Sequence, residues 1–474
     1  MNYKGILFFL GIYSLFISFF FILNILYSIY FNFNFVSYIS SLTISLLAGS
    51  LFCFLGRKYT KNISIYDQII LIVLSFTFLP LLICIPYFLS DYDISFLNSY
   101  FESVSGFTAT GFSIINNVED IDEPLLLWRS SSQWLGGLFF LVAIIGTLGL
   151  KTVKIKPAYL ISGANLSGNF YNNFNSNFVK ILLIYFFTTI FIIFLYSFAN
   201  IRLFDSFNLA FTTISSGGFL PKNSLSLIVT NNFKVSVLSI SLLFPIFNFY
   251  LIFKIFSNQF KIQDHQEDLH LGIIIMILTL LFYFFFIPTE GIADVFLAIT
   301  SSISTSGITT YSSSVSSVDI SIFCILLTII GGSLVSTSSG VKYIRFYILL
   351  KISYQEIYRL VKPINIFNRN LFRSEIKIND DDSKISFLVF TLFIIAIFVL
   401  SSILTLDNLD FENSFKLSIL TLTNTVSSSL YGTENLSFID LKGLTKVALI
   451  IFMILGKIEI IAVLYLIKRF IFRG

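Results

Sequence analysis

The sequence predicts an all-α polytopic membrane protein. Of its 474 residues, 56% are hydrophobic and only 12% are charged, whereas a soluble globular chain carries about 25% charged residues. The mean hydropathy of +0.87 excludes a disordered chain and a soluble enzyme. Ten apolar segments are long enough for helices that cross a bilayer, which takes about 20 residues. Because backbone groups in lipid must be hydrogen-bonded internally, these segments are expected to be helices and not barrel strands.

The expected spans follow one another along the whole chain. They cover approximately residues 5–30, 36–56, 66–89, 124–150, 177–199, 231–257, 271–288, 318–352, 384–405 and 443–470. The linkers between them are alternately rich in Lys and Arg and rich in Asp and Glu. The positive-inside rule places the basic linkers, and with them both termini, in the cytoplasm. The acidic linkers then face outward, where they either concentrate cations or simply solvate the loops.

Four outward linkers share one spaced pattern. Each has Asn or Asp, an aromatic residue two positions later, Ser or Thr at ten positions, and Gly or Val at thirteen. The pattern begins at Asn98, Asp205, Asp294 and Asn413. It ends at Gly111, Gly218, Gly307 and Val426. Three glycines at one offset are difficult to explain by chance, so the chain is predicted to contain a fourfold internal repeat.

The spacing predicts four half-helices that enter the membrane part-way. Asn and Asp are good N-caps, and a ten-residue helix is about 15 Å long, half of the ~30 Å hydrocarbon core. Each half-helix must return by a non-helical leg, which survives at that depth only where it is buried or lines a cavity. Glycine would let each leg turn its carbonyls inward. Four legs around one axis would offer a ring of oxygens that replaces the hydration shell of an ion.

The candidate ion-binding residues lie at the turn of each leg. They are Ala109, Thr110, Gly111, Ser216, Gly217, Gly218, Thr305, Ser306, Gly307, Asn424, Thr425 and Val426. The C-terminal ends of the short helices would also favour a cation in the cavity below. The alternative for any single linker is a polar, Gly-containing connection between two spans.

A gate is expected below these legs. The segment 318–352 is too long for one crossing, and its middle is rich in small residues that favour a break in the helix. The candidates are Gly331, Gly332, Ser338, Ser339 and Gly340. The alternative is that these small residues only allow close helix packing.

Lys457 is the second gate candidate. It lies eleven residues before Lys468, about 16 Å along the last helix, and therefore near mid-membrane. A lysine there costs about 2.5–3.5 kcal/mol on insertion scales, so it needs a cavity or a partner. We expect it to face the water cavity below the legs and oppose resting cations; the alternative is a salt bridge to another helix.

These motifs resemble the Trk/Ktr/HKT superfamily of potassium transporters, specifically its TrkH type, over nearly the whole chain. The resemblance is carried by FESVSGFTATG, WRSSSQWLGG, FTTISSGGFLPKN, TSSISTSGITT, IGGSLVSTSSGVKYIR and MILGKIEI. It implies four helix–P-loop–helix repeats around a central pore, plus two extra N-terminal transmembrane helices. The corresponding division is 1–62 for the two extra helices, 63–156 for repeat 1, 157–262 for repeat 2, 263–362 for repeat 3 with its broken inner helix, and 363–474 for repeat 4.

The resemblance also implies a function and partners. The chain is expected to be no enzyme but a potassium uptake protein of the cell (inner) membrane, forming a homodimer regulated by a cytoplasmic TrkA-like nucleotide-binding subunit. No cofactor beyond the permeant K⁺, no metal site and no nucleic acid partner are expected. Two positions depart from the family pattern: Val426 stands where glycine is usual, and Lys457 where arginine is. Val426 keeps a sodium or mixed monovalent cation transporter open as the alternative.

Overall fold

The computed structural model describes residues 2–59, 64–148, 170–256, 265–285, 291–310, 318–361, 369–372, 377–407, 409–433 and 436–458. Within these ranges the regular structure is helical, apart from one isolated bridge between Asn370 and Lys377. Six helices in this part of the chain are long and apolar enough to cross a membrane. The predicted all-α polytopic fold is therefore confirmed.

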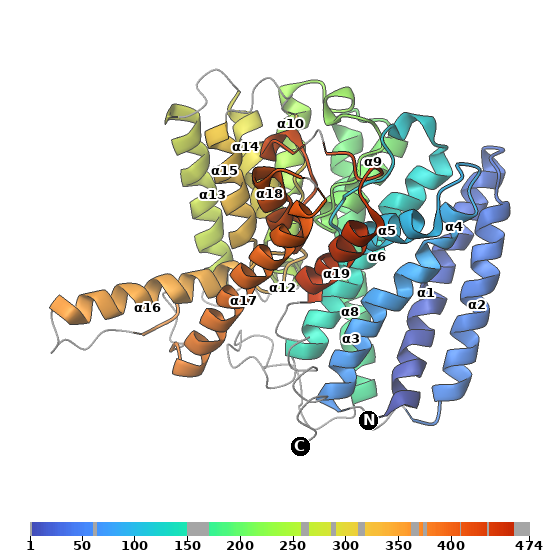
Figure 1. Cartoon of the computed structure of the whole chain (residues 1–474), viewed down its shortest axis with the longest axis horizontal. Helices are drawn as coiled ribbons and strands as arrows, with labels where there is room; N and C mark the ends of the chain where they lie inside the picture. The colour runs from blue at the N-terminus through green and yellow to red at the C-terminus, as the bar shows by residue number, and fades with distance from the viewer. Residues whose placement is uncertain are drawn as a thin grey trace.

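The two N-terminal helices, α1 (Tyr3–Tyr30) and α2 (Val36–Gly56), lie side by side at one edge of the bundle (Figure 1). Their backbones approach closely at two glycines, because a Cβ added to Gly11 would lie 2.8 Å from the carbonyl oxygen of Gly49. Leu47 and Phe54 on α2 are exposed, as expected for a surface that faces lipid. Small residues at such a contact are typical of helix pairs in membranes.

Four short helices repeat along the rest of the chain. They are α5 (Phe96–Phe107), α9 (Leu203–Ile214), α14 (Ile292–Ile303) and α18 (Phe411–Leu422). Each has 12 residues and is therefore about 18 Å long. All four lie in the upper half of the bundle in Figure 1, where none of them traverses its full height. The predicted half-helices are present.

Further helices flank each half-helix on both sides. Those before them are α3 (Ile65–Ile83) with α4 (Ile85–Phe88), α8 (Phe170–Phe198), α13 (Gln266–Phe285) and α17 (Asp380–Thr405). Those after them are α6 (Glu123–Leu148), α10 (Asn232–Ser241), α15 (Val318–Ile330) and α19 (Gly443–Ile458). The helix–leg–helix order thus occurs four times, while the boundaries drawn between repeats stay a prediction.

The expected N-caps of the half-helices are wrong. The Asn or Asp of the pattern is the third residue of each helix, and the cap positions are Ser95, Arg202, Gly291 and Asp410. Only the Asp410 side chain accepts a capping bond, from the backbone N–H of Asn413 at 3.2 Å. In α9 and α14 the pattern residues Asp205 and Asp294 lie in the first turn, where a negative charge favours the helix without capping it.

Besides the one-residue interruption at Cys84 between α3 and α4, two expected spans are broken. The segment 318–352 divides, as predicted, into α15 and α16 (Tyr343–Val361), and α16 projects away from the bundle (Figure 1). The segment 231–257 also divides, which was not predicted, into α10, α11 (Leu243–Ile246) and α12 (Phe249–Phe256). Pro245 lies at this break, and proline has no N–H to continue a helix.

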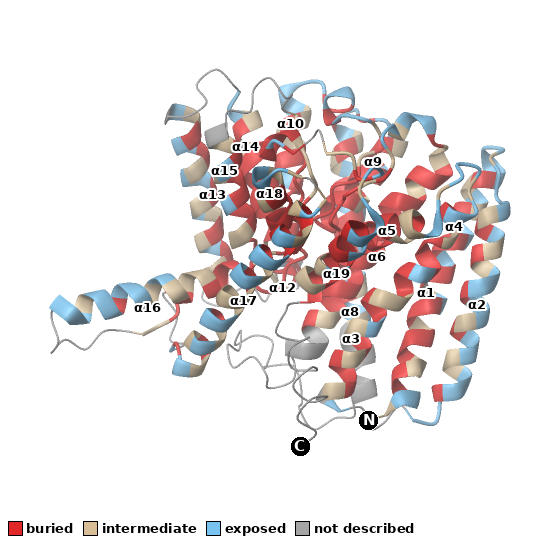
Figure 2. Cartoon of the chain, in the orientation of Figure 1, coloured by how far each residue is buried: buried red, intermediate tan, exposed pale blue. Residues whose placement is uncertain are grey.

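The buried residues concentrate where α5, α6, α9, α18 and α19 meet (Figure 2). Close packing there depends on glycines in the helices that follow the first and fourth half-helices. A Cβ at Gly136 would lie 1.8 Å from the carbonyl oxygen of Phe107, the last residue of α5. In repeat 4, a Cβ at Gly456 would lie 2.4 Å from the carbonyl oxygen of Leu422, the last residue of α18.

Gly136→Ala is expected to destabilise the protein by about 1–3 kcal/mol, because it overpacks a contact with rigid backbone. The measurement is the thermal unfolding midpoint of the purified full chain in detergent. Gly272→Ala is the matched control, since the nearest atom to its added Cβ would be 3.7 Å away. Equal midpoints for the two variants would contradict this account of the packing.

Candidate ion filter and gate

All four half-helices end in the same backbone motif. The C-cap is Ser or Thr, and the next residue is left-handed: Ala109 (φ 57°), Ser216 (φ 58°), Thr305 (φ 60°) and Asn424 (φ 49°). The following N–H then donates back to the helix: Thr110 to Ser105 at 2.9 Å, Gly217 to Thr212 at 2.8 Å, Ser306 to Ser301 at 3.0 Å and Thr425 to Leu420 at 2.9 Å. This is the Schellman arrangement, which satisfies helix carbonyls and turns the chain away from the helix axis.

The turn therefore lies two residues before the position that the sequence indicated. Glycine was expected to supply the left-handed conformation, but the residue that has it in every leg is Ala, Ser, Thr or Asn. Of the last positions, Gly111 (φ 83°) and Gly307 (φ 68°) are also left-handed. Gly218 and Val426 are not, so the valine carries none of the strain that a β-branched residue has at positive φ.

The four return legs, residues 108–112, 215–219, 304–308 and 423–427, meet at one place. A Cβ at Gly111 would lie 3.1 Å from the Cα of Gly218 and 3.0 Å from the Cβ of Val426. A Cβ at Gly218 would lie 2.9 Å from the carbonyl oxygen of Ser306. A Cβ at Gly307 would lie 3.0 Å from the carbonyl oxygen of Val426. The structure thus brings residues from all four repeats into contact.

The carbonyl groups of the legs are available at this junction. Within the described residues, none of the carbonyls of 109–111, 216–218, 305–307 and 424–426 accepts a hydrogen bond. The first N–H groups of the legs, by contrast, are used by the helix ends. Buried carbonyls are rarely left without a donor, and carbonyl rings of this kind replace the hydration shell of a cation.

Asn424 links two of the legs to a neighbouring helix. Its side-chain amide donates to the hydroxyl of Thr110 at 2.9 Å and to the carbonyl oxygen of Met453 at 2.9 Å. Asn424 is fully buried. The leg of repeat 4 is therefore fixed both to the leg of repeat 1 and to α19.

A buried ion pair braces the first leg, which the sequence analysis did not single out. Arg129 on α6 contacts Glu102 on α5, with 3.0 Å between Nε and Oε1, and both side chains are buried. Glu102 also accepts from the backbone N–H of Ile114 at 2.9 Å, and Arg129 donates to the hydroxyl of Ser113 at 3.0 Å. The guanidinium lies 4.2 Å from the ring centre of Phe219 in the second leg. The only available sequence signal was two charges inside otherwise apolar segments.

The loop between α15 and α16 lies directly against two legs. The hydroxyl of Thr337 donates to the carbonyl oxygen of Ile214, the last residue of α9, at 2.8 Å and lies 3.2 Å from the hydroxyl of Ser216. The backbone N–H of Ser339 donates to the hydroxyl of Thr305 at 3.0 Å. The gate candidates are therefore in contact with the candidate filter.

The loop has its own internal structure. Gly331 (φ 65°) and Gly340 (φ 83°) are left-handed near its two ends, a conformation that glycine adopts without steric cost. The N–H of Gly332 donates to the hydroxyl of Ser338 at 2.9 Å. Lys342 is buried and donates to the carbonyl oxygen of Ser336 at 3.2 Å.

Lys457 faces the same loop. Its ammonium lies 3.4 Å from the carbonyl oxygen of Thr337, 3.3 Å from the hydroxyl of Ser339 and 4.5 Å from the ring centre of Phe140. The side chain is buried. None of the ion pairs found in the described ranges includes Lys457, so the alternative of a salt bridge has no support there.

Several acidic groups of the predicted outer linkers are paired with cations. Arg202 lies 2.6 Å from Glu123, and Lys442 lies 2.8 Å from Asp407. Hydrogen bonding from the Lys442 side chain lowers the pKa of Asp407 below its usual value. These ion pairs reduce the electric field that the acidic linkers could apply to cations. They favour the simpler interpretation that the acidic residues solvate the loops.

No group of three or more potential metal ligands occurs in the described part of the chain.

Comparisons with known proteins agree with this architecture. The TrkH family, described as cation transport proteins, matches residues 32–288 and 289–471. An uncharacterized cation transporter of Methanocaldococcus jannaschii is 27% identical over 99% of this chain and 96% of its own. The Trk system potassium uptake protein TrkG of Escherichia coli is 27% identical over 86% of each chain.

The fold is also that of a solved structure. The crystal structure of the potassium transporter TrkH from Vibrio parahaemolyticus matches with a TM-score of 0.87 over 98% of both chains, at 21% identity. Because the family match covers most of the sequence, the chain belongs to the TrkH family of cation transport proteins, and it is a membrane transporter and not an enzyme.

Proposed function

We propose that this protein takes up potassium across the cell (inner) membrane through a gated pore whose filter is the junction of the four legs. The observation that carries the proposal is that four helix ends of the same form bring to one place carbonyls that accept no hydrogen bond from the described residues. Relatives that match most of this chain are named potassium uptake proteins. The membrane potential supplies about 2.3 kcal/mol per charge per 100 mV, so uptake needs no further energy source and no cofactor beyond the permeant ion.

The gate is the loop at 331–340 together with Lys457. Its support is that Thr337 and Ser339 contact the second and third legs, while Lys457 holds the same two loop residues. Withdrawal of the loop would break these bonds and clear the space below the filter. Such an opening is a two-state rearrangement that a partner could bias.

A homodimer and a cytoplasmic TrkA-like nucleotide-binding subunit are the proposed partners, with both termini in the cytoplasm. The support is α16, which leaves the bundle (Figure 1) and exposes Leu350, Tyr354, Ile357 and Leu360. Large exposed apolar patches mark protein–protein or membrane interaction sites, and because α16 leaves the bundle we assign this one to a partner.

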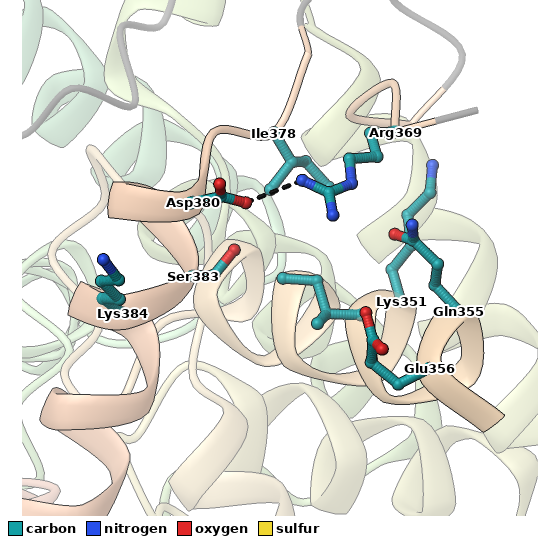
Figure 3. Close-up of a pocket in the computed structure, with 9 residues that line it drawn as sticks. Lys351, Gln355, Glu356, Arg369, Ile378, Asp380, Ser383 and Lys384 are labelled. Carbon is teal, nitrogen blue, oxygen red and sulfur yellow. Dashed lines mark hydrogen bonds and ion pairs between the residues drawn. The ribbon is translucent and has the colours of Figure 1, made fainter. Parts of the chain in front are cut away.

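A cavity of about 240 Å³ lies beside the middle of α16, against the start of α17 (Figure 3). Its lining includes Lys351, Gln355 and Lys384. Arg369 and Asp380 form an ion pair of 2.7 Å across it. These charges, next to the exposed apolar residues, give a partner on this side both polar and apolar contacts.

A sodium or mixed cation transporter is the second candidate. The observation that favours it is Val426, because the fourth leg lacks the glycine present in the other three. Reversal potentials in opposed K⁺ and Na⁺ gradients separate the two functions. A reversal potential at the K⁺ equilibrium supports the potassium pathway, and one near zero supports the mixed pathway.

The test of the proposed function is growth of a potassium-uptake-deficient strain on low potassium, with the chain expressed beside Gly218→Asp. A Cβ at Gly218 would lie 2.4 Å from the Cβ of Val426, so aspartate disrupts the junction and should abolish growth. Equal amounts of the two proteins in the membrane fraction exclude an expression effect. Growth retained by Gly218→Asp would argue against the filter.

A further inference from the structure

The outer end of the leg junction is occupied by the side chain of Val426. The three glycines at the matching position all face this one side chain. A Cβ added to each would lie within 3.0 Å of a Val426 side-chain atom: 3.0 Å for Gly111, 2.4 Å for Gly218 and 2.7 Å for Gly307. The three glycine backbones therefore surround the valine, and its isopropyl group fills the space between them.

Burial shows which end of the junction the valine occupies. Gly111, Gly218 and Gly307 are buried, as are the residues that precede them in each leg. Val426 and the two residues after it are only half-buried. The valine therefore lies between solvent on one side and the buried leg carbonyls on the other.

We propose that Val426 is a hydrophobic plug at the outer end of the filter, which sets the conductance of the pore. This inference rests on the proposed function, because it assigns a role within that pathway. A cation that approaches from outside meets the isopropyl group of Val426 between the three glycines, and its methyl groups offer no ligand to replace lost water. Apolar constrictions of this kind obstruct ions by excluding water. The valine must shift before an ion reaches the carbonyls beneath it.

The backbone permits such a shift without remodelling the leg. The backbone of Val426 is not in the left-handed conformation, so a shift of its side chain requires no change in a strained backbone. The hydroxyl of the next residue, Ser427, donates to the carbonyl oxygen of Thr433 at 2.6 Å and holds the chain in place. On the inner side, the buried Asn424 fixes the leg to Thr110 and Met453. The leg is therefore held on both sides of the valine, and Val426 itself is the element that obstructs the opening.

The experiment is K⁺ and Na⁺ flux into proteoliposomes that contain the full chain with Gly, Ala, Val or Ile at position 426. We expect flux to fall in that order, with Val426→Gly about tenfold above the wild type, which corresponds to ~1.4 kcal/mol of barrier. The K⁺/Na⁺ flux ratio should stay within about twofold, because the carbonyls below the plug are unchanged. Val118→Gly and Val118→Ala, at another half-buried outer valine outside the legs, are the matched controls and should leave flux at the wild-type level.

The outcomes separate the plug from the proposed pathway. If the wild type conducts and flux does not depend on the residue at 426, the plug is wrong while the pathway stands. A collapse of the K⁺/Na⁺ ratio without a rise in flux would also overturn it, since the valine would then act in selection. If neither the wild type nor Val426→Gly passes either ion, the pathway itself is wrong. Flux through Val426→Gly, with none through the wild type, would support the plug most strongly.

Discussion

Lys457→Met is expected to raise the potassium flux of the reconstituted protein by about tenfold. The ammonium holds the loop through the Thr337 carbonyl and the Ser339 hydroxyl, and hydrogen bonds to a charged group contribute about 1.5–3 kcal/mol each. Loss of one such contact is enough for a tenfold change in the population of the open loop. Methionine preserves the length of the side chain and its packing on Phe140, so the change removes mainly the charge.

Two control variants show whether a rise in flux comes from the loss of the positive charge at position 457. Lys457→Arg keeps the positive charge and should conduct like the wild type. Lys446→Met makes the same substitution on the same helix, where the ammonium donates to Asn98 at 2.8 Å and to Ile439 at 2.9 Å and not to the loop. Flux at or below the wild-type level in a folded Lys457→Met protein would show that the lysine does not hold the gate closed.

Arg129→Met is expected to cost about 3–5 kcal/mol of stability, because it leaves the buried carboxylate of Glu102 without its partner. Glu102 also accepts a hydrogen bond from the backbone N–H of Ile114, just beyond the first leg. The thermal midpoint should therefore fall, and any folded protein should lose K⁺ over Na⁺ discrimination. The double variant Arg129→Met with Glu102→Gln removes the unpaired charge and should recover part of the midpoint but not the discrimination.

The control is an exposed ion pair of similar geometry. Arg202→Gln breaks the contact of Arg202 with Glu123 at 2.6 Å, in which the Arg202 side chain is 60% exposed. Such pairs contribute about 0–1 kcal/mol, so the midpoint should hardly change. If Arg129→Met and Arg202→Gln shift the midpoint equally, the buried pair is not a brace of the filter.

Much of the architecture was predictable because it follows from local properties of the chain. Long apolar segments must be helical in lipid, and the constant offset to Gly111, Gly218 and Gly307 indicated the repeat. The break at 331–340 was predictable from small residues, and the break near Pro245 could have been found from the proline. The caps at Asp205 and Asp294 were misplaced because an acidic residue favours the first turn as well as the cap.

The site depended more on tertiary structure. The left-handed residue of each leg is Ala109, Ser216, Thr305 or Asn424, four residue types that share no propensity visible along a sequence. The pair of Glu102 and Arg129 joins positions 27 residues apart, and only the packing of α5 on α6 brings them together. Val426 was recognised as a departure, but its contact with three glycines exists only once the legs meet.

The central claim is that carbonyls from all four legs bind one dehydrated monovalent cation. Anomalous diffraction from crystals of the full chain grown in rubidium tests it most directly. We predict a rubidium peak enclosed by residues 109–110, 216–217, 305–306 and 424–425, on the inner side of Val426. Ordered legs with rubidium bound only elsewhere, or legs that do not meet around a common centre, would contradict the account.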